Sequence, residues 1–406
     1  MTAQQEAYRA LVHRMAELTG TDPNDWFLVT KARQGMQTAL LAMREATGRT
    51  EVISQLFTCV TAIDPILTAG LAPRYADISP DTLAADLNTV DVGDKTCAIV
   101  LQNTYGIIAS DAAARMCDIA HQAGALVLED SAHCVGRMAR DALGNPLADV
   151  SVHSFGVEKM LFGTYFGGAV WVNPAMSNAN VAVAVRGALE ALPTADAALQ
   201  KAARSYRNQV RMLTRLPHGV ATRLRGSWER KGTHEPAVSE AERKGRTNHE
   251  PSKPSVWMCE QALAACEDLS ANEARRRSCV RAYLDCFDGE ALGELGVPKA
   301  VLAAADQPLL RFPVFAPNQA AAEAAAQAVA DLGYYVPAWP RPLLVPGVLD
   351  PAPYGLNEGM DAWPVSERLS AGVVALPTDI DPTNVPSVAQ AVLSALLGGR
   401  AAAIKS

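Results

Sequence analysis

Residues 97–130 read CAIVLQNTYGIIASDAAARMCDIAHQAGALVLED. The apolar runs Cys97–Gln102 and Ala125–Leu128 predict two strands. Between them apolar residues recur at helical spacing, with Ser110 as the expected N-cap and Gly124 as the stop. A strand, a helix of about 13 residues and a second strand form a βαβ unit with parallel pairing and a right-handed crossover. Because ligands of such sheets collect at the carboxyl ends of the strands, we expect the functional site just past these two runs.

The same alternation extends on both sides of this unit. Further strands are predicted at Glu51–Leu56, Ala72–Ile78, Asp149–Ser154 and Gly168–Val172. Towards the end of the chain, PLLRFPVFA (308–316) and GVVALPTD (372–379) predict strands, and NQAAAEAAAQAVADLG (318–333) and VPSVAQAVLSALLGG (385–399) predict helices. We therefore expect a large α/β domain over residues 1–260 and a smaller C-terminal α/β domain over 261–406.

Residues 229–254 differ from their surroundings. They are polar, rich in Pro and Gly, and contain ERKG and HEP twice, without apolar periodicity. This composition predicts a mobile loop near the domain boundary. A single helix is predicted after it, over 255–283.

Composition excludes several classes of protein. The 406 residues are 49% hydrophobic and 19% charged, with a mean hydropathy of +0.03, which excludes a disordered or fibrous chain. The net charge of −7 argues against a general nucleic-acid surface. No uncharged apolar run reaches the roughly 18 residues that cross a bilayer, and the N-terminus lacks a signal-peptide core. Eight cysteines without a CxxC pair predict buried free thiols, so we expect a cytoplasmic protein.

A carboxylate and a lysine follow neighbouring predicted strands. Asp130 comes directly after the ALVL strand, and Lys159 follows the next strand in SFGVEK (154–159). A cofactor of the pyridoxal type needs such a pair, because a lysine amine forms the imine (Schiff base) and a buried carboxylate keeps the ring nitrogen protonated. Its phosphate needs hydroxyls and backbone N–H groups, for which Ser154 and the run at 33–38 entering a helix are candidates. No metal site is expected.

These motifs resemble a known family. EDSAH (129–133), SFGVEK and GGAVWVN (167–173) are similar to the EDxAQ, SFxxxK and GGAV signatures of the sugar aminotransferase family named DegT/DnrJ/EryC1/StrS. FTCVTAIDPILTAGLAPRYADIS, QNTYGIIASDAAARMCDIAHQAG and WPVSERLSAGVVALPTD resemble further blocks in the same order. The resemblance implies a pyridoxal-phosphate-dependent transferase of fold type I, with a large mixed-sheet domain and a smaller C-terminal α/β domain.

The resemblance also implies roles for individual residues. Lys159 matches the Schiff-base lysine and proton shuttle, and Asp130 the partner of the pyridine nitrogen. His133 stands where the family commonly has Gln beside the ring, and Ser154 matches a phosphate-binding serine. The remaining cofactor positions are Gly35, Met36 and Gln37, which align with the family's Ser-Gly-Thr turn, and Cys59, which stands where a stacking aromatic ring is usual and has Phe57 close by.

The implied activity is transfer of an amino group from a donor such as glutamate to a keto-sugar, expected to be nucleotide-linked, in polysaccharide or antibiotic sugar biosynthesis. A homodimer is expected, with neither nucleic acid nor membrane as a partner. Two alternatives stay open. One is a keto-sugar dehydratase, although such members replace the lysine with His. The other is a non-catalytic or regulatory member, because Ser255 and Trp257 replace the Asn and Arg of the family's GYNxRM and the Ser-Gly-Thr turn is altered.

Overall fold

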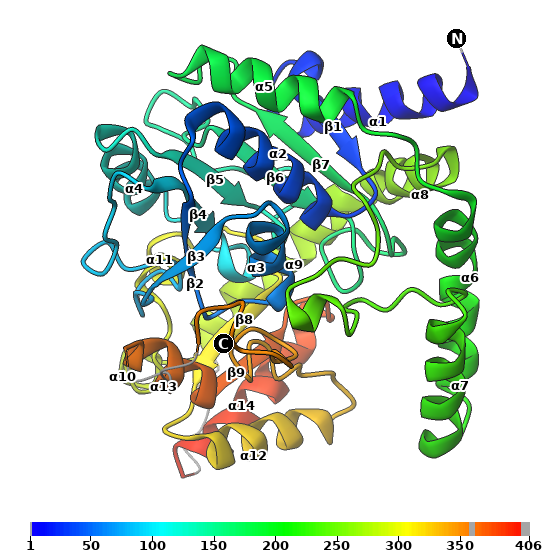
Figure 1. Ribbon diagram of the computed structural model, residues 1–406. Helices are drawn as coiled ribbons and strands as arrows, with labels where there is room; N and C mark the ends of the chain where they lie inside the picture. Colours follow the sequence, from blue (N-terminus) through cyan, green and yellow to red (C-terminus); the bar gives the residue numbers. More distant parts are fainter. Residues whose placement is uncertain (1, 357–361, 399–406) are drawn as a thin grey trace.

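The computed structural model describes residues 2–356 and 362–398 and contains a seven-stranded sheet between two layers of helices (Figure 1). The strand order is β1-β7-β6-β5-β4-β2-β3. Strands β2 to β6 pair in parallel, whereas β7 runs antiparallel to both β6 and β1, so the sheet is mixed. The strands are β1 (Trp26–Val29), β2 (Glu51–Gln55), β3 (Ala72–Ala76), β4 (Thr96–Gln102), β5 (Leu126–Asp130), β6 (Val150–Ser154) and β7 (Gly168–Val172).

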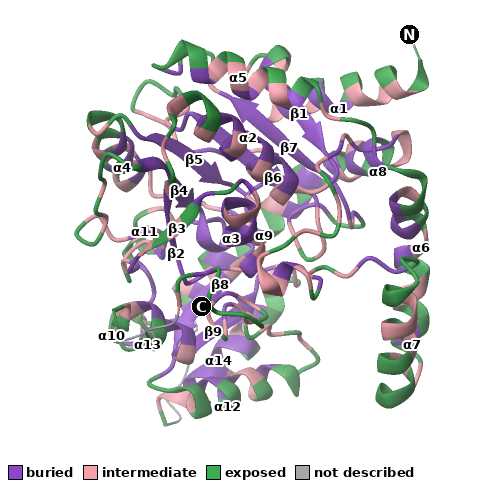
Figure 2. Ribbon diagram, in the orientation of Figure 1, coloured by how far each residue is buried: buried purple, intermediate pink, exposed green. Residues whose placement is uncertain are grey.

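Both faces of the sheet are covered, and every residue of strands β4, β5, β6 and β7 is buried (Figure 2). Alternate residues of β4, such as Ala98 and Val100, pack with α2 (Ala32–Thr47), α3 (Val60–Thr68) and α5 (Ala179–Glu190). The residues between them face the opposite layer, formed by α1 (Ala3–Thr19), α4 (Ser110–Gln122) and α8 (Val256–Glu267). The carboxyl ends of the parallel strands stay open between these layers.

The structure confirms the six strands predicted in this domain and adds one. The short strand β1 was missed, because four apolar residues give no measurable period. Helix α4 is confirmed with one correction at its start. The N-cap is Ala109, and Ser110 is the first helical residue and makes no capping bond. Gly124 ends the helix at φ +68, as its position predicts.

The C-terminal part has its own core around an antiparallel pair of strands, β8 (Arg311–Phe315) and β9 (Val373–Pro377). It contains α9 (Leu269–Cys286), α10 (Gly289–Glu294), α11 (Lys299–Ala303), α12 (Gln319–Ala330), α13 (Pro364–Gly372) and α14 (Val385–Leu396). The predicted single helix over 255–283 is in fact two, α8 and α9, which meet at Asp268. The predicted boundary at residue 260 falls inside α8, which packs on α1.

Two helices project from the body of the protein at the right of Figure 1: α6 (Ala197–Leu213) and α7 (His218–Arg230). Helix α7 buries none of its residues. Short 3₁₀ turns occur at Pro23–Asp25, Thr104–Gly106, Glu242–Lys244 and Pro382–Asn384. Within the described residues no helix has the length and apolarity needed to cross a bilayer. All eight cysteines are free thiols, and seven of them are buried.

Candidate active site

The carboxyl ends of β4, β5 and β6 open into a cavity of about 270 Å³. Six residues selected from the sequence line it: Met36, Cys59, Asp130, His133, Ser154 and Lys159. They come from α2, the N-cap of α3, strands β5 and β6 and the loops after these two strands. The parallel sheet brings them together because each follows or faces the end of a strand. Gly35 and Gln37 do not line the cavity.

Lys159 lies in the turn after β6, with its ammonium among the walls of the cavity. Its Nζ makes no hydrogen bond and no ion pair with any described residue. Burial lowers the pKa of Lys159, and the charge of Arg33 adds to this, while Cys59, Asp130 and Glu158 oppose it. A depressed pKa increases the fraction of free amine, which is the nucleophilic form. The adjacent Glu158 is exposed, as predicted, but it also lines the cavity, because the chain turns at this residue (φ +58) and is not extended.

Asp130 is the last residue of β5 and is buried. Its Oδ1 accepts a hydrogen bond from the N–H of Ala132 at 3.0 Å, and its other oxygen has no protein partner among the described residues. Burial raises the pKa of Asp130, while the Ala132 N–H and the charge of Lys159 oppose this rise. A cationic group placed in the cavity would therefore find a carboxylate oxygen that is still free.

The neighbouring Glu129 faces the other side of the strand, where it is fully hydrogen-bonded. Its carboxylate accepts from Asn103 Nδ2 at 2.8 Å, from Ala139 N at 2.7 Å and from Ser151 Oγ at 2.8 Å. Burial raises its pKa against these donors. These hydrogen bonds, on the face of β5 opposite to Asp130, hold the end of the strand and hence the position of Asp130.

His133 has a defined tautomer. The N–H of Tyr105 donates to its Nδ1 at 3.0 Å, so this nitrogen is an acceptor. Burial, with a smaller contribution from Lys159, lowers the pKa of His133 well below its ordinary value. The neutral ring therefore carries its proton on Nε2, which leaves one N–H donor on a cavity-lining side chain. Trp339 packs edge-on against the same ring at 4.8 Å between centroids.

On the opposite side of the cavity, Ser154 and the start of α2 supply further donors. Ser154 Oγ accepts from Gly156 N at 3.2 Å, and its own proton has no protein acceptor in the described chain. Helix α2 begins at Ala32, after the N-cap Lys31, which makes no side-chain cap. The first-turn N–H groups of Ala32 and Arg33 therefore adjoin the cavity.

This arrangement corrects the predicted phosphate cradle at Gly35, Met36 and Gln37. These residues lie one turn further along α2, where backbone N–H groups are used inside the helix. Gly35 instead packs against Val170 and Val29 of the sheet. Met36 lines the cavity, while Gly35 and Gln37 do not. The prediction came from aligning these three residues with the family's Ser-Gly-Thr turn, whereas the first turn of α2 starts at Ala32.

The role of Gly35 in packing gives a first prediction. In Gly35→Ala the new Cβ would lie far inside contact distance of Val170 Cγ2, and we expect a loss of about 1–3 kcal/mol in the free energy of unfolding, measured by urea denaturation. Gly187→Ala is the matched control, because nothing lies within 4 Å of a Cβ at that position of α5. That variant should gain about 0.5–1 kcal/mol from helix propensity. Equal stability of the two variants would contradict the packing role.

Cys59 lies at the N-cap of α3 with its thiol partly exposed to the cavity. Its Sγ donates to Val345 O at 3.1 Å and accepts from Thr61 Oγ1 at 3.1 Å. Phe57 does not replace a stacking ring, because it is fully buried in the C-terminal core and does not line the cavity. The rings that do line it include Tyr105, Tyr165, Tyr206 and Trp339.

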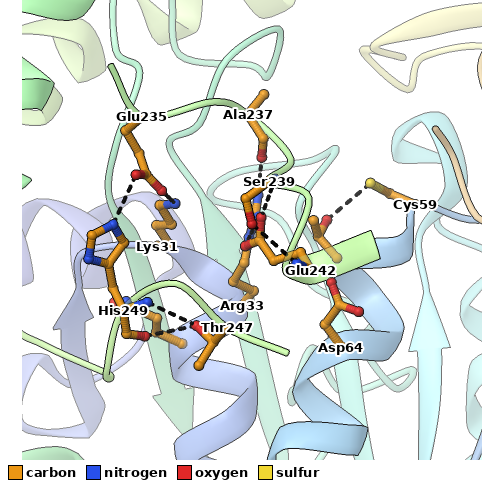
Figure 3. A network of polar contacts seen from close by, with 12 residues as sticks. Lys31, Arg33, Cys59, Asp64, Glu235, Ala237, Ser239, Glu242, Thr247 and His249 are labelled. Atoms are coloured by element: carbon orange, nitrogen blue, oxygen red, sulfur yellow. Dashed lines mark hydrogen bonds and ion pairs between the residues drawn. The ribbon is translucent and has the colours of Figure 1, made fainter. Parts of the chain in front are cut away.

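The segment predicted as a loop forms one wall of the cavity through residues 235–238 (Figure 3). Ion pairs join Lys31 to Glu235 and Arg33 to Glu242. Arg33 also donates to Ala237 O at 2.8 Å, and His249 Nε2 lies 2.9 Å from Glu235. Burial alone would raise the pKa of Glu235, but His249 and Lys31 outweigh it and lower the pKa to about 2. The segment is thus a packed part of the site.

Lys31 is the main residue of the site that sequence reasoning did not assign, and Arg33 was included only as the first residue of the candidate run at 33–38. A basic residue on either side of Ala32 is a weak signal, and it gains meaning only after β1 shows that α2 starts there. Trp339 lies more than 170 residues beyond Lys159, so no local pattern could have connected them.

Comparisons with known proteins agree with this geometry. The chain resembles the putative sugar aminotransferase Spr1654 from Streptococcus pneumoniae in its PMP form, with 18% identity, a TM-score of 0.65, and coverage of 97% of this chain and 92% of that one. It resembles DesI, solved in the presence of its TDP-sugar product, with 23% identity, a TM-score of 0.64, and coverage of 97% and 86%. It also resembles an aminotransferase from Psychrobacter cryohalolentis, with 17% identity, a TM-score of 0.66, and coverage of 97% of this chain and 92% of that one. These likenesses show the fold, which is that of the fold type I transferases.

The family model of the DegT/DnrJ/EryC1/StrS aminotransferases matches residues 10–209. This range contains all seven strands of the large sheet and the residues Asp130, His133, Ser154 and Lys159. Over these residues the chain is therefore similar to the DegT/DnrJ/EryC1/StrS aminotransferase family.

Proposed function

We propose that the protein is a pyridoxal-phosphate-dependent aminotransferase that moves an amino group from an amino acid such as glutamate to a keto-sugar. The observation that supports this most directly is the pairing, across one cavity, of a lysine without protein partners and a carboxylate with one free oxygen. A structural ion pair would leave neither group unused.

The chemistry of the unused groups fits pyridoxal phosphate. An amine suits the aldehyde, a carboxylate oxygen suits the ring nitrogen, and the N–H of His133 suits an oxygen on the ring. The hydroxyl of Ser154 and the first-turn amides of α2, with Lys31 and Arg33 beside them, suit a phosphate. When bound, this cofactor supplies an electron sink for bond cleavage at the amino carbon.

The chain's own residues then have distinct tasks. The Lys159 amine would hold the cofactor and afterwards, once free, move a proton between the substrate carbon and the cofactor's C4′ atom. Asp130 would stay ionised against the ring N–H⁺, because each charge favours the other in a buried site. The aromatic side chains of Tyr105 and Trp339 would exclude water from the reacting atoms.

The sugar is proposed to be nucleotide-linked, by analogy with DesI, whose crystal structure was determined in the presence of a TDP-sugar product. The test is incubation of the purified protein with glutamate and a panel of nucleotide-linked keto-sugars, with amino-sugar formation followed by mass spectrometry. Formation of an amino sugar that requires both glutamate and pyridoxal phosphate supports the proposal. A protein that fails to take up the cofactor, judged from its visible absorption, contradicts it.

A second candidate is a regulatory member of the family that binds the cofactor poorly. Lys31 and Arg33 are already paired with Glu235 and Glu242, and Ser255 is used as the N-cap of α8, where it accepts from Met258 N at 3.4 Å. These contacts reduce the groups available for a phosphate. A dissociation constant for pyridoxal phosphate above cellular cofactor levels would favour this candidate.

We also propose that the protein is a homodimer and that it is cytoplasmic. The projecting helices α6 and α7 support the proposal of a homodimer. Residues 201–231 contain nine basic residues and one acidic residue, whereas the whole chain carries −7. Arg204, Arg207 and Arg211 lie on one exposed face of α6, and none of the nine basic residues forms an ion pair within 2–356 and 362–398. A second, acidic copy of the chain would complement this face.

Charge reversal tests this assignment. In the double variant Arg207→Glu/Arg211→Glu we expect the dimer dissociation constant, measured by analytical ultracentrifugation, to rise at least about tenfold, because attraction becomes repulsion. Arg207→Lys/Arg211→Lys keeps the charge and should leave it within about threefold. A monomeric wild-type protein would rule out the assignment.

A further inference from the structure

A buried carboxyl group, Asp64, lies beneath the segment that forms one wall of the cavity. We call residues 234–250 the lid segment. Asp64 lies in α3 and is 3% exposed, and its Oδ2 has no hydrogen-bond partner among residues 2–356 and 362–398. Its Oδ1 lies 2.6 Å from the hydroxyl oxygen of Tyr354, which is fully buried. An ionised carboxylate with one orphaned buried oxygen would be costly, so this setting favours the neutral acid.

The hydrogen bonds of Tyr354 lead to the same conclusion by a count of protons. Its hydroxyl oxygen receives the N–H of Gly245 at 2.9 Å and also contacts the backbone carbonyl of Glu242. A carbonyl can only accept, so the single hydroxyl proton goes to Glu242. The short contact with Asp64 is then a hydrogen bond only if Asp64 supplies the proton.

We propose that Asp64 is a positioning residue that carries a proton and, through Tyr354, holds the lid segment closed over the cavity. Asp64 donates to Tyr354, Tyr354 donates to the carbonyl of Glu242, and the carboxylate of Glu242 pairs with Arg33 at the start of α2. The chain of contacts therefore runs from α3 through Tyr354 and the lid segment to the cavity wall. Figure 3 shows how Asp64, Glu242 and Arg33 lie.

The charged and titratable groups around Asp64 agree with this assignment. Burial raises the pKa of Asp64 to about 8, Glu242 adds to the rise and Arg33 opposes it. A Tyr354 hydroxyl that donated to Asp64 would also oppose the rise, whereas a hydroxyl that accepts the Asp64 proton favours the neutral acid. Arg33 and Glu242 are paired with each other, so their effects on Asp64 largely cancel. The hydroxyl of Tyr75 in β3 is buried and has no hydrogen-bond partner in the part of the chain that the structure describes. Burial, together with the charge of Asp64, raises the pKa of Tyr75.

The sign of the pH dependence follows from these states. With the lid segment closed, Asp64 keeps its proton up to about pH 8. With the segment open and the carboxyl in water, it would ionise near pH 4. Between these values opening releases one proton, so the opening equilibrium rises by up to about tenfold per pH unit, and above pH 8 the rise levels off.

Hydrogen–deuterium exchange of the backbone amides of residues 239–245 at pH 5, 6, 7 and 8 tests whether Asp64 holds the lid segment closed, and this measurement needs no cofactor. Each rate is divided by that of Asp64→Asn at the same pH, which cancels intrinsic exchange, and Asn keeps a donor for Tyr354. We expect the ratio of the wild-type exchange rate to the Asp64→Asn exchange rate to rise by up to about tenfold per pH unit. Glu240→Gln, an exposed neighbour paired with Lys244, is the matched control and should keep the wild-type slope. A ratio that does not change with pH overturns the proposal.

If Asp64→Asn fails to fold, the pH dependence of exchange in the wild-type protein alone tests the proposal. Its protection factors in 239–245 must then fall with pH while those of the buried strand β4 stay constant, and parallel behaviour of both regions overturns the proposal. The effect on the cofactor rests on the proposed function: pyridoxal phosphate should dissociate faster from wild type as the pH rises. If the opening of the lid segment depends on pH but the dissociation rate of pyridoxal phosphate does not, the role of Asp64 is supported and the proposed binding of the cofactor in this cavity is contradicted.

Discussion

Replacing Lys159 with alanine is expected to lower the rate of amino transfer by at least about 10⁴-fold and to abolish the visible absorption of the bound cofactor. The physical reason is that one amine would perform two steps, attachment of the cofactor and proton transfer, and no other lysine with an unpaired amine lines the cavity in the described chain. This loss corresponds to about 5.5 kcal/mol of the activation barrier. Steady-state kinetics and an absorption spectrum measure it.

The control for this variant is an exposed lysine outside the cavity. Lys95 is solvent-exposed and does not line the cavity, so Lys95→Ala should retain activity within about threefold of wild type. Circular dichroism should show that both variants are folded. Retention of more than a tenth of the activity by Lys159→Ala would show that the amine of Lys159 is not the reacting group.

Replacing Asp130 with asparagine is expected to lower the rate by about 10²–10⁴-fold while leaving the lysine-bound cofactor visible in the absorption spectrum. Asparagine keeps the size of the side chain and its contact with the N–H of Ala132 but removes the negative charge opposite the ring nitrogen. Without that charge the ring nitrogen loses its proton more readily, and the electron sink weakens.

Glu129→Gln provides the contrast, because the two carboxyl groups are adjacent on one strand and face opposite sides. Glu129 accepts hydrogen bonds from Asn103, Ala139 and Ser151, and one of these donors would lose its acceptor. We expect a loss of about 1–3 kcal/mol in the free energy of unfolding with activity per folded molecule close to wild type. Equal catalytic losses in the two variants would mean that Asp130 acts by supporting the strand.

The parts of the fold that could be predicted from sequence are those with a clear period or a strong stop signal. The buried runs that became β4 to β7, the helix before Gly124 and the strand–helix pairs of the C-terminal part all have such signals. Strand β1 has four residues and no turn signal that separates it from α2, so the start of that helix was misplaced. The expected phosphate cradle came from the resemblance to the family's Ser-Gly-Thr turn, and it lies one turn beyond the observed start of α2.

The residues of the candidate site also fall into those that could be predicted from the sequence and those that could not. Asp130 and Lys159 follow strand ends, where topology alone brings side chains together, and the structure places both at one cavity. The wall formed by residues 235–238 could not be predicted, because its position depends on ion pairs with Lys31 and Arg33, more than 200 positions earlier in the chain. Neither composition nor period encodes such pairs.

The distribution of the eight thiols also decides how the protein can be labelled. Burial raises the pKa values of Cys117, Cys134 and Cys259 to about 12 and those of Cys266 and Cys279 to about 11, and it raises those of Cys97 and Cys286 as well. Maleimides react with accessible thiolates, so these seven should stay inert in the native state. Cys59 is the exception, since it is partly exposed where it meets the cavity. The unmodified chain therefore offers a single attachment point for a fluorescent dye beside the reacting groups.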